Sequence, residues 1–171
     1  EDTKAAWSEV INQYQRRADL IPNLVAAVKG YAEHERETLE GVVNARSKAT
    51  GIQVTPDMLK NPAAFEEFQK AQAGLTSALG RLIAIAEQYP NLKADQNFRD
   101  LQSQLEGTEN RIAVARQDFN RAVQGYNTAA QQFPGVIVAR LAGFNVRPYF
   151  QAEAAAAKAP KVEFNLGKPA P

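Results

Sequence analysis

The fold of this chain is decided by residues 98–133, which read FRDLQSQLEGTENRIAVARQDFNRAVQGYNTAAQQF. Every third or fourth residue in this stretch belongs to one apolar seam, in which Thr108 is the only small polar member. The seam consists of Phe98, Leu101, Leu105, Thr108, Ile112, Ala115, Phe119, Ala122, Tyr126, Ala129 and Phe133. A period of 3.5 residues is typical of a helix that packs against others in a left-handed supercoil. We therefore expect one helix of about 50 Å, covered by other helices.

Two further helices are predicted beside this stretch. From Thr3 to Ala49 apolar residues recur at the same spacing, and their phase continues unchanged through Pro22. Since proline removes one helical hydrogen bond and usually kinks the helix, we expect one long helix with a kink there. Another helix is predicted from Pro62 to Tyr89, with Asn61 as its N-cap. With residues 98–133, these helices predict an up-down-up bundle.

The C-terminal part predicts shorter elements. Residues 136–142 and 149–159 read as short helices, and residues 161–171 as an extended tail. In an up-down-up bundle, the apolar run at 133–144 would lie at the end opposite the N-terminus. The predicted fold is thus all-α: an elongated antiparallel bundle of three long helices with coiled-coil-like packing, followed by short C-terminal helices. The predicted bundle domain covers residues 1–160.

The composition limits the chemistry available to the chain. Lysine and arginine total 20 against 19 acidic residues, so no basic excess favours a nucleic-acid partner. There is no cysteine and a single histidine, His34, which rules out the common zinc sites and nucleophilic constellations. No glycine-rich phosphate loop, H-E-x-x-H or G-x-S-x-G motif occurs. We therefore predict no catalytic, cofactor-binding or metal site, and no apolar run is long enough to span a bilayer.

A polar stripe runs beside the seam of the 98–133 helix. Its residues share one helix face because they are spaced three and four apart. They are Glu106, Glu109, Ala113, Arg116, Asn120, Val123 and Asn127. One interpretation is a face that pairs with the other helices; the other is a recognition surface for a partner. With the basic pair before Pro22, its polar members give the candidate interaction residues: Arg16, Arg17, Glu106, Glu109, Arg116, Asn120 and Asn127.

Two charged residues occupy seam positions of the first predicted helix. They are Glu35 and Arg46, and an unpaired buried charge there would be strongly destabilising. Either they pair, with Arg116 and Glu109 as the expected partners, or the seam is open to water at these positions.

Several strings occur in a recognisable order along the chain. They are RRADLIPNLV at 16–25, YPNLK at 89–93, LEGTENRI at 105–112 and PKVEF at 160–164. Together they resemble the LemA family of bacterial proteins over essentially the whole chain; a small departure is Phe119, where many relatives look like tyrosine. The resemblance implies a long helical bundle held to a membrane by a segment upstream, either a transmembrane helix or a lipoprotein-type leader. The family it resembles has no established enzymatic activity, and related proteins are linked to membrane organisation. The resemblance therefore implies a non-enzymatic protein.

The predicted function is therefore that of a non-enzymatic, membrane-anchored scaffold of the bacterial cell envelope. We expect a protein partner, no cofactor and no nucleic acid, with the bundle on the periplasmic side. The alternative is a membrane-remodelling or lipid-contacting protein that uses the apolar segment Val136–Phe144. A third interpretation is a ligand-sensing module, which would need converging polar groups in a deep cleft.

Overall fold

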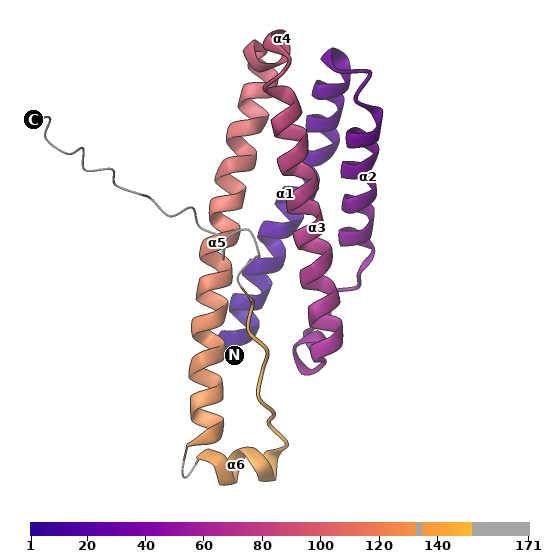
Figure 1. Cartoon of the computed structure of the whole chain (residues 1–171). Helices are drawn as coiled ribbons and strands as arrows, with labels where there is room; N and C mark the ends of the chain where they lie inside the picture. The colour runs from indigo at the N-terminus through magenta and orange to yellow at the C-terminus, as the bar shows by residue number, and fades with distance from the viewer. Residues whose placement is uncertain (133–134, 152–171) are drawn as a thin grey trace, which may run out of the picture.

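The computed structural model describes residues 1–132 and 135–151, and these contain helices and no strand. Figure 1 shows an elongated bundle, which confirms the predicted all-α antiparallel fold. The elements are α1 (Asp2–Tyr31), α2 (Arg36–Gly51), the 3-10 helix η1 (Pro56–Lys60), α3 (Pro62–Ala86), α4 (Pro90–Ala94), α5 (Gln96–Gln131) and α6 (Gly135–Ala142).

The long helix α5 forms one side of the bundle over its whole length. It packs mainly along α1, while α2 packs on α3 and α1. Successive helices run in opposite directions, so α1, α2, α3 and α5 go up, down, up and down (Figure 1). The predicted helix at 98–133 is therefore confirmed as far as Gln131, and Phe133 lies outside the described residues. The first seven seam residues, from Phe98 to Phe119, are buried.

The predicted single helix from Thr3 to Ala49 is wrong. Helix α1 ends at Tyr31, the chain reverses through a turn in which the N–H of Glu35 donates to the carbonyl of Ala32 (3.0 Å), and α2 runs back. The spacing misled because Ala32, Leu39 and Val42 remain buried on both sides of the turn. A helical hairpin around one core keeps its apolar residues three and four apart, and that spacing carries no information about direction.

Pro22 lies inside α1, which continues past it. Proline has no N–H, so the carbonyl four residues earlier, on Ala18, loses its helical partner. Nε of Arg46, on α2, donates a hydrogen bond to the Ala18 carbonyl oxygen at 2.9 Å. Arg46 of α2 thus supplies the hydrogen bond that the Ala18 carbonyl lacks because Pro22 has no N–H.

Two clusters of buried residues fill the bundle. In the orientation of Figure 1, with α4 at the top and α6 at the bottom, they are an upper and a lower cluster. The upper cluster is largely aliphatic and lies among α1, α2, α3, α4 and α5; its members include Ile21, Leu24, Val28, Val42, Leu75, Leu82, Leu92, Phe98 and Leu105. The lower cluster is rich in aromatic residues, and α2 does not reach it; its members include Trp7, Val10, Tyr14, Met58, Leu59, Phe65, Phe68, Phe119 and Phe150.

Capping side chains begin two of the helices, α3 at the lower end of the bundle and α5 at the upper end. Asn61 caps α3 as predicted, since its side-chain oxygen accepts from the N–H of Ala64 at 3.2 Å. Helix α3 ends at Ala86, three residues before the predicted end, and the short helix α4 lies between α3 and α5. Asp95 then caps α5 by accepting from the N–H of Phe98 at 2.9 Å.

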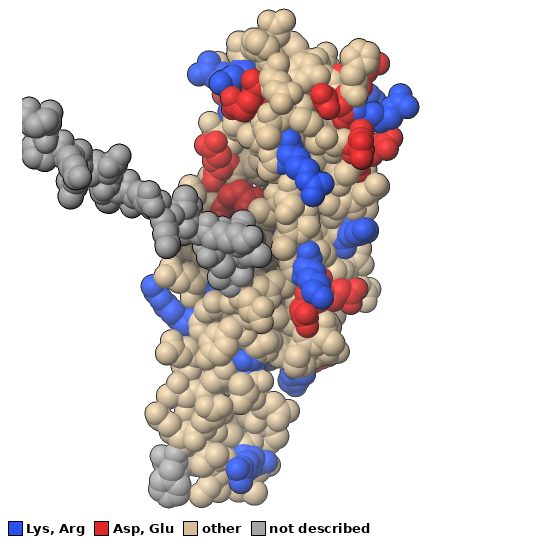
Figure 2. Space-filling view, in the orientation of Figure 1, with Lys and Arg blue, Asp and Glu red and all other residues tan. Residues whose placement is uncertain are grey.

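The predicted short helix after residue 133 is present as α6. It ends at Ala142 and is followed by Gly143, whose φ of 73° is a conformation that glycine adopts without strain. Contrary to prediction, α6 lies at the same end of the molecule as the N-terminus, because the hairpin adds one reversal of direction (Figure 1). Acidic and basic side chains crowd the opposite end, whereas the α6 end shows no acidic side chain on the face in Figure 2.

Residues 144–151 form an extended strap that returns from α6 along α5. Residues 149–151 are not helical, so the predicted helix at 149–159 is wrong in its first three positions. The rest of that helix and the predicted tail at 161–171 lie outside the described residues.

Candidate interaction site

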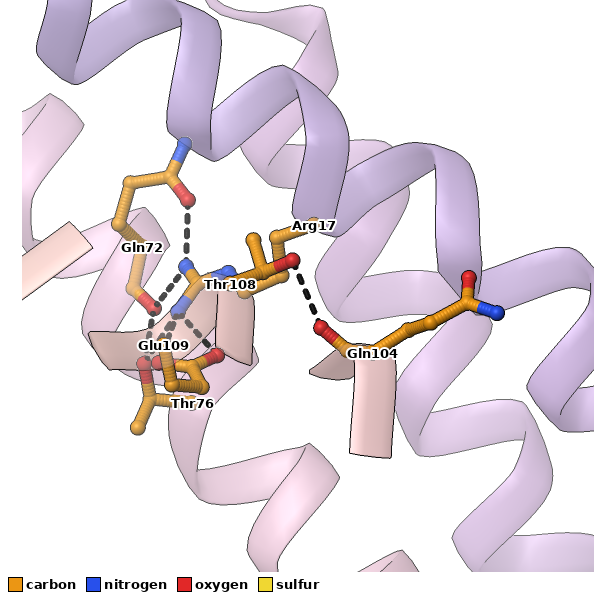
Figure 3. Close-up of polar contacts among 6 residues, drawn as sticks. All are labelled: Arg17, Gln72, Thr76, Gln104, Thr108 and Glu109. Atoms are coloured by element: carbon orange, nitrogen blue, oxygen red, sulfur yellow. Dashed lines mark hydrogen bonds and ion pairs between the residues drawn. The ribbon is translucent and has the colours of Figure 1, made fainter. Parts of the chain in front are cut away.

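Arg17 lies at the boundary between the two clusters and is only 1% exposed. Its guanidinium donates to the carbonyl oxygen (3.1 Å) and the side-chain Oε1 (2.7 Å) of Gln72, and to Oγ1 of Thr76 (2.8 Å). It also pairs with the carboxylate of Glu109 at 3.2 Å. Figure 3 shows these groups converging on Arg17. A buried guanidinium requires such partners, because leaving it unpaired would be strongly destabilising.

The polar seam residue Thr108 lies beside this network. Its hydroxyl donates to the carbonyl of Gln104 on the preceding turn at 2.8 Å (Figure 3). The hydroxyl is therefore satisfied within α5, and the side chain, which is 5% exposed, packs as a small core residue.

Two asparagines of α5 hold the strap by its backbone. Asn120 donates to the carbonyl of Phe150 (3.2 Å) and accepts from its N–H (2.9 Å). Asn127 makes the same pair of bonds with Arg147, at 3.1 and 2.8 Å. A side-chain amide carries a donor and an acceptor side by side, so it can bind one residue of extended backbone as a neighbouring strand would.

The end of the strap is fixed by further contacts. The carbonyl of Gln151 accepts from Arg116 of α5 at 2.8 Å and from Gln69 of α3 at 3.1 Å. The guanidinium of Arg116 lies 5.0 Å from the ring centre of Phe150, which is itself buried against Trp7. The strap thus covers the lower cluster between α5 and α3.

The buried row of α5 changes where the strap packs. The seam predicts burial of Ala122, Tyr126 and Ala129, but the buried residues after Phe119 are Val123 and Asn127. The predicted seam is therefore wrong in its last repeats. The reason is that α5 extends beyond its helical neighbours here, so its partner is the strap, which approaches on the Asn127 face.

The candidate residues thus divide into three groups. Arg17 and Glu109 belong to the buried network, whereas Arg116, Asn120 and Asn127 bind the strap. Arg16 and Glu106 are exposed. Glu106 and Glu109 line a groove of about 380 Å³ between α3 and α5, whereas Arg16 lines a separate groove of about 510 Å³ between α1 and α5.

The predicted pairing of Glu35 and Arg46 with Arg116 and Glu109 is wrong. Glu35 accepts a hydrogen bond from the hydroxyl of Tyr89 at 3.0 Å, and Arg46 binds the backbone of α1. Both residues belong to the hairpin, and the reversal at 32–35 separates Glu35 from the middle of the bundle. The hydrogen bond to Glu35 raises the pKa of Tyr89, and burial adds to the effect.

A second tyrosine–carboxylate contact lies at the same end. The hydroxyl of Tyr31 donates to Asp95 at 2.9 Å, which raises the pKa of Tyr31. The N–H of Phe98 is the main cause of the lowered pKa of Asp95, and the Tyr31 hydroxyl adds to it. The upper end of the bundle is thus closed through groups that can ionise.

Sequence reasoning missed two members of the buried network, Gln72 and Thr76 of α3. The predicted 62–89 helix has an apolar seam that includes Phe68 and Leu75, and Gln72 stands between them at the same spacing. A polar residue in such a seam signals a buried partner. Thr76 carries no such signal, because it lies one turn away on the flank of the seam.

Among residues 1–132 and 135–151, no group of three or more histidine or acidic side chains is arranged to hold a metal ion. No described helix combines the length and apolar character needed to cross a membrane. The arrangement instead binds protein groups: a guanidinium in the core and an extended backbone along α5.

Comparison with known proteins gives one consistent family. Residues 6–164 match the model of the LemA family. Magnetosome protein MamQ 2 of Paramagnetospirillum magneticum is 30% identical over 167 residues, covering 88% of this chain and 61% of that protein. Magnetosome protein MamQ of Magnetospirillum gryphiswaldense is 30% identical over 169 residues, with the same coverage. Protein LemA of Metamycoplasma hominis is 28% identical over 122 residues, covering 70% of this chain and 50% of that protein. The chain spans about 61% of the length of the MamQ proteins.

Proposed function

Because the chain belongs to the LemA family, we propose that it is a non-enzymatic, membrane-anchored scaffold of the bacterial cell envelope. An N-terminal segment would hold the bundle at the bilayer, on the periplasmic side, as resemblance to the family implies. The helices would then present protein-binding surfaces beside the membrane. Three observations on the described residues support this function.

The observation that carries the proposal is the way α5 binds the strap. Asn120 and Asn127, two helical turns apart, each bind one residue of extended backbone through a donor–acceptor pair. The polar stripe of α5 is therefore a surface suited to peptide backbone. Its contacts are made by amides and a guanidinium, which recognise protein groups and supply no nucleophile or proton-transfer group.

The upper part of the same face offers room for a partner. The groove between α3 and α5 is lined by the carboxylates of Glu106 and Glu109, together with Asn110 and apolar atoms of Leu79 and Ile83. Glu109 already pairs with Arg17, so Glu106 is the carboxylate that faces outward. We propose that this groove binds a basic or amide-rich segment of a protein partner.

The third observation is the ion pair between Arg17 and Glu109. Buried Arg17 of α1 binds Thr76 of α3 and Glu109 of α5, and both of these residues line the groove, so Arg17 holds the two walls in position. Arg17 and Glu109 are positioning residues in this proposal, and the contacts with a partner are assigned to Glu106 and the groove around it.

Photo-crosslinking in cells tests the partner. A photo-crosslinking residue in place of Gln102, which lines the groove, should give a product with one envelope protein. Adding Glu106→Lys should lower its yield about fivefold, the effect of losing roughly 1 kcal/mol of ion-pair energy. The matched control is Glu40→Lys on exposed α2, which changes the net charge equally and should leave the yield unchanged. Equal loss in both variants, or no product at all, would contradict the proposed docking groove.

Fractionation tests the anchored location separately. The natural full-length protein should stay with membranes after washes with high salt and carbonate. In spheroplasts the bundle should be degraded by added protease. Recovery in the soluble fraction would overturn the membrane proposal, and protection in spheroplasts would place the bundle on the other side.

A further inference from the structure

Exposed large apolar side chains concentrate at one end of the described chain. Nine such residues are exposed, and six of them lie between residues 137 and 149. The six are Ile137, Val138, Leu141, Phe144, Val146 and Tyr149. Single exposed apolar residues need no explanation, but a contiguous group marks a surface that contacts something apolar.

Helix α6 turns its larger apolar residues outward. Ala139, which is 6% exposed, marks the inner face. Ile137 and Leu141 are four residues apart, so they share a face, which lies opposite Ala139 on a helix of 3.6 residues per turn. Their exposed fractions are 51% and 85%. The small residue therefore packs inward and the large aliphatic residues point away from the protein.

This end of the molecule is a braced unit, which we name the foot: the last two turns of α5, α6 and residues 143–149. Tyr126 packs edge-on against Phe144 at 6.3 Å, and the guanidinium of Arg147 lies 4.5 Å from the Tyr126 ring centre. The Asn127 pair holds the backbone of Arg147 to α5. Presenting the apolar face of α6 therefore requires no loss of native contacts.

The charge of the foot has one sign. The sequence contains no aspartate or glutamate from residue 119 to 151, and three arginines. Arg140 is exposed on α6, about 100° around the helix from Ala139, and Arg147 lies on the strap. In Figure 2 the foot shows a basic side chain and no acidic one on the visible face. Aliphatic residues flanked by arginine, without carboxylates, match the interface of an anionic bilayer, where basic groups meet headgroups and apolar groups meet acyl chains.

From this geometry we infer that the foot is a lipid-contact surface, which inserts Ile137, Leu141 and Phe144 into the interface of an anionic membrane. The inference rests on the proposed membrane association and adds a second point of contact to it. The N-terminus and α6 lie at the same end of the bundle, so an anchor that precedes Glu1 would bring the foot to the bilayer (Figure 1).

Vesicle flotation of the 171-residue chain tests this inference without an anchor or a protein partner. The chain should float with vesicles of equal phosphatidylcholine and phosphatidylglycerol, and much less with phosphatidylcholine alone. Ile137→Ser combined with Leu141→Ser should reduce binding about tenfold or more, because the inserted apolar area is lost. Arg140→Gln should reduce binding to the anionic vesicles about fivefold and weaken its salt dependence.

The matched control is Val43→Ser combined with Val114→Ser, at exposed valines outside the foot, which should bind like the parent chain. Circular dichroism should show all variants folded, since only exposed side chains change. Absence of binding to anionic vesicles, or equal loss in the control, would overturn the inference. So would a lipid-independent dimer that needs Ile137 and Leu141, because a second copy would then cover this face. Failure here leaves fractionation of the anchored protein unaffected, so the two proposals fail separately.

Discussion

The cores of the upper and lower halves of the bundle are filled by different kinds of side chain, aliphatic in the upper half and largely aromatic in the lower half. In the upper half four long helices and the short α4 surround the core, and the upper cluster is built mainly of leucine, valine, isoleucine and alanine. In the lower half α2 is absent, and six aromatic side chains meet: Trp7, Tyr14, Phe65, Phe68, Phe119 and Phe150. Phe150 comes from the strap, far along the chain from its neighbours.

The difference shows how the chain replaces a missing helix. Segments without α-helix, at residues 52–61 and 144–151, supply the remaining wall of the lower cluster. Such segments bury few side chains each, so large rings are needed to fill the space. Trp7 alone contacts the rings of Phe65, Phe68, Phe119 and Phe150, at centroid distances of 5.5 to 6.1 Å. The core of the lower half therefore consists largely of a few aromatic side chains, and the core of the upper half of many smaller aliphatic ones.

The largest expected effect comes from removing the central ring. Trp7→Ala should lower the free energy of unfolding by about 3–5 kcal/mol, because it leaves a large cavity among four rings. It should also loosen the strap, so the amides of Arg147 and Phe150 should exchange faster with solvent by NMR. Leu82→Ala in the upper cluster should cost about 2–5 kcal/mol and leave the exchange of these two amides, relative to global stability, unchanged. Equal effects on the strap amides would remove the distinction between the halves.

The second prediction concerns the layer between the halves. Arg17→Met should lower the free energy of unfolding by about 2–4 kcal/mol, because Gln72 and Glu109 lose their buried cation; the value is below that of a fully buried pair since Glu109 is partly exposed. Denaturant unfolding measures this change. Arg16→Met, the same substitution at the exposed neighbour, should stay within about 0.5 kcal/mol of the parent. Adding Glu109→Gln to Arg17→Met should recover part of the loss, and no recovery would contradict the ion pair.

The helical fold could be predicted from the sequence because apolar spacing reports burial directly. The spacing located α3 and α5, the apolar run at 136–142 located α6, and the Asn61-Pro62 pair located the cap of α3. It could not show the reversal at 32–35, since a hairpin keeps the same spacing, and the direction of every later helix depends on that turn. The sequence also could not show which group Arg46 binds. Its hydrogen bond to the Ala18 carbonyl arises only when α2 folds back beside Pro22.

The candidate site was predicted in part for the same reason. The stripe on α5 does lie on one face, as helical geometry requires. Which group each residue contacts depends on the strap, whose extended backbone has no periodic signal and is brought to α5 only by the reversal after α6. Arg17 and Glu109 lie 92 residues apart in the chain, so their pairing required the three-dimensional arrangement of α1 and α5.

The third prediction tests the strap directly. Asn120→Ala or Asn127→Ala should each lower the free energy of unfolding by about 1–3 kcal/mol, because two backbone groups of the strap lose their partners. Amide exchange should rise at Phe150 in the first variant and at Arg147 in the second. Asn110→Ala, at an exposed position of the same helix, should change neither measurement. Unchanged exchange in the two strap variants would contradict the backbone pairing.

The fourth prediction, with the smallest expected effect, is that the contribution of the upper end to the unfolding free energy depends on pH, whereas that of the lower end does not. The lower end is closed by amides, which do not titrate, whereas the upper end is closed by carboxylates and tyrosines. The N–H of Phe98, followed by the hydroxyl of Tyr31, lowers the pKa of Asp95 in the folded chain. Its contribution to stability is therefore present above the unfolded pKa of about 3.9 and is lost as the pH falls through the folded value. The hydrogen bond to Asp95 raises the pKa of Tyr31, so that contribution is present below pH of about 10 and is lost as the pH rises further.

Asp95→Asn should flatten the pH dependence of the unfolding free energy on both limbs. The asparagine oxygen still accepts from the N–H of Phe98, so α5 keeps its cap, but no charge remains to titrate or to hold the Tyr31 proton. Urea unfolding from about pH 5 down to 2, and again above about pH 9, measures the two slopes. Asp57→Asn in η1, an exposed aspartate of the lower half, should leave both slopes as they are. If Asp57→Asn flattens the acid limb as much as Asp95→Asn does, the pH response does not belong to the upper end, and the contrast between ionisable and amide closures is lost.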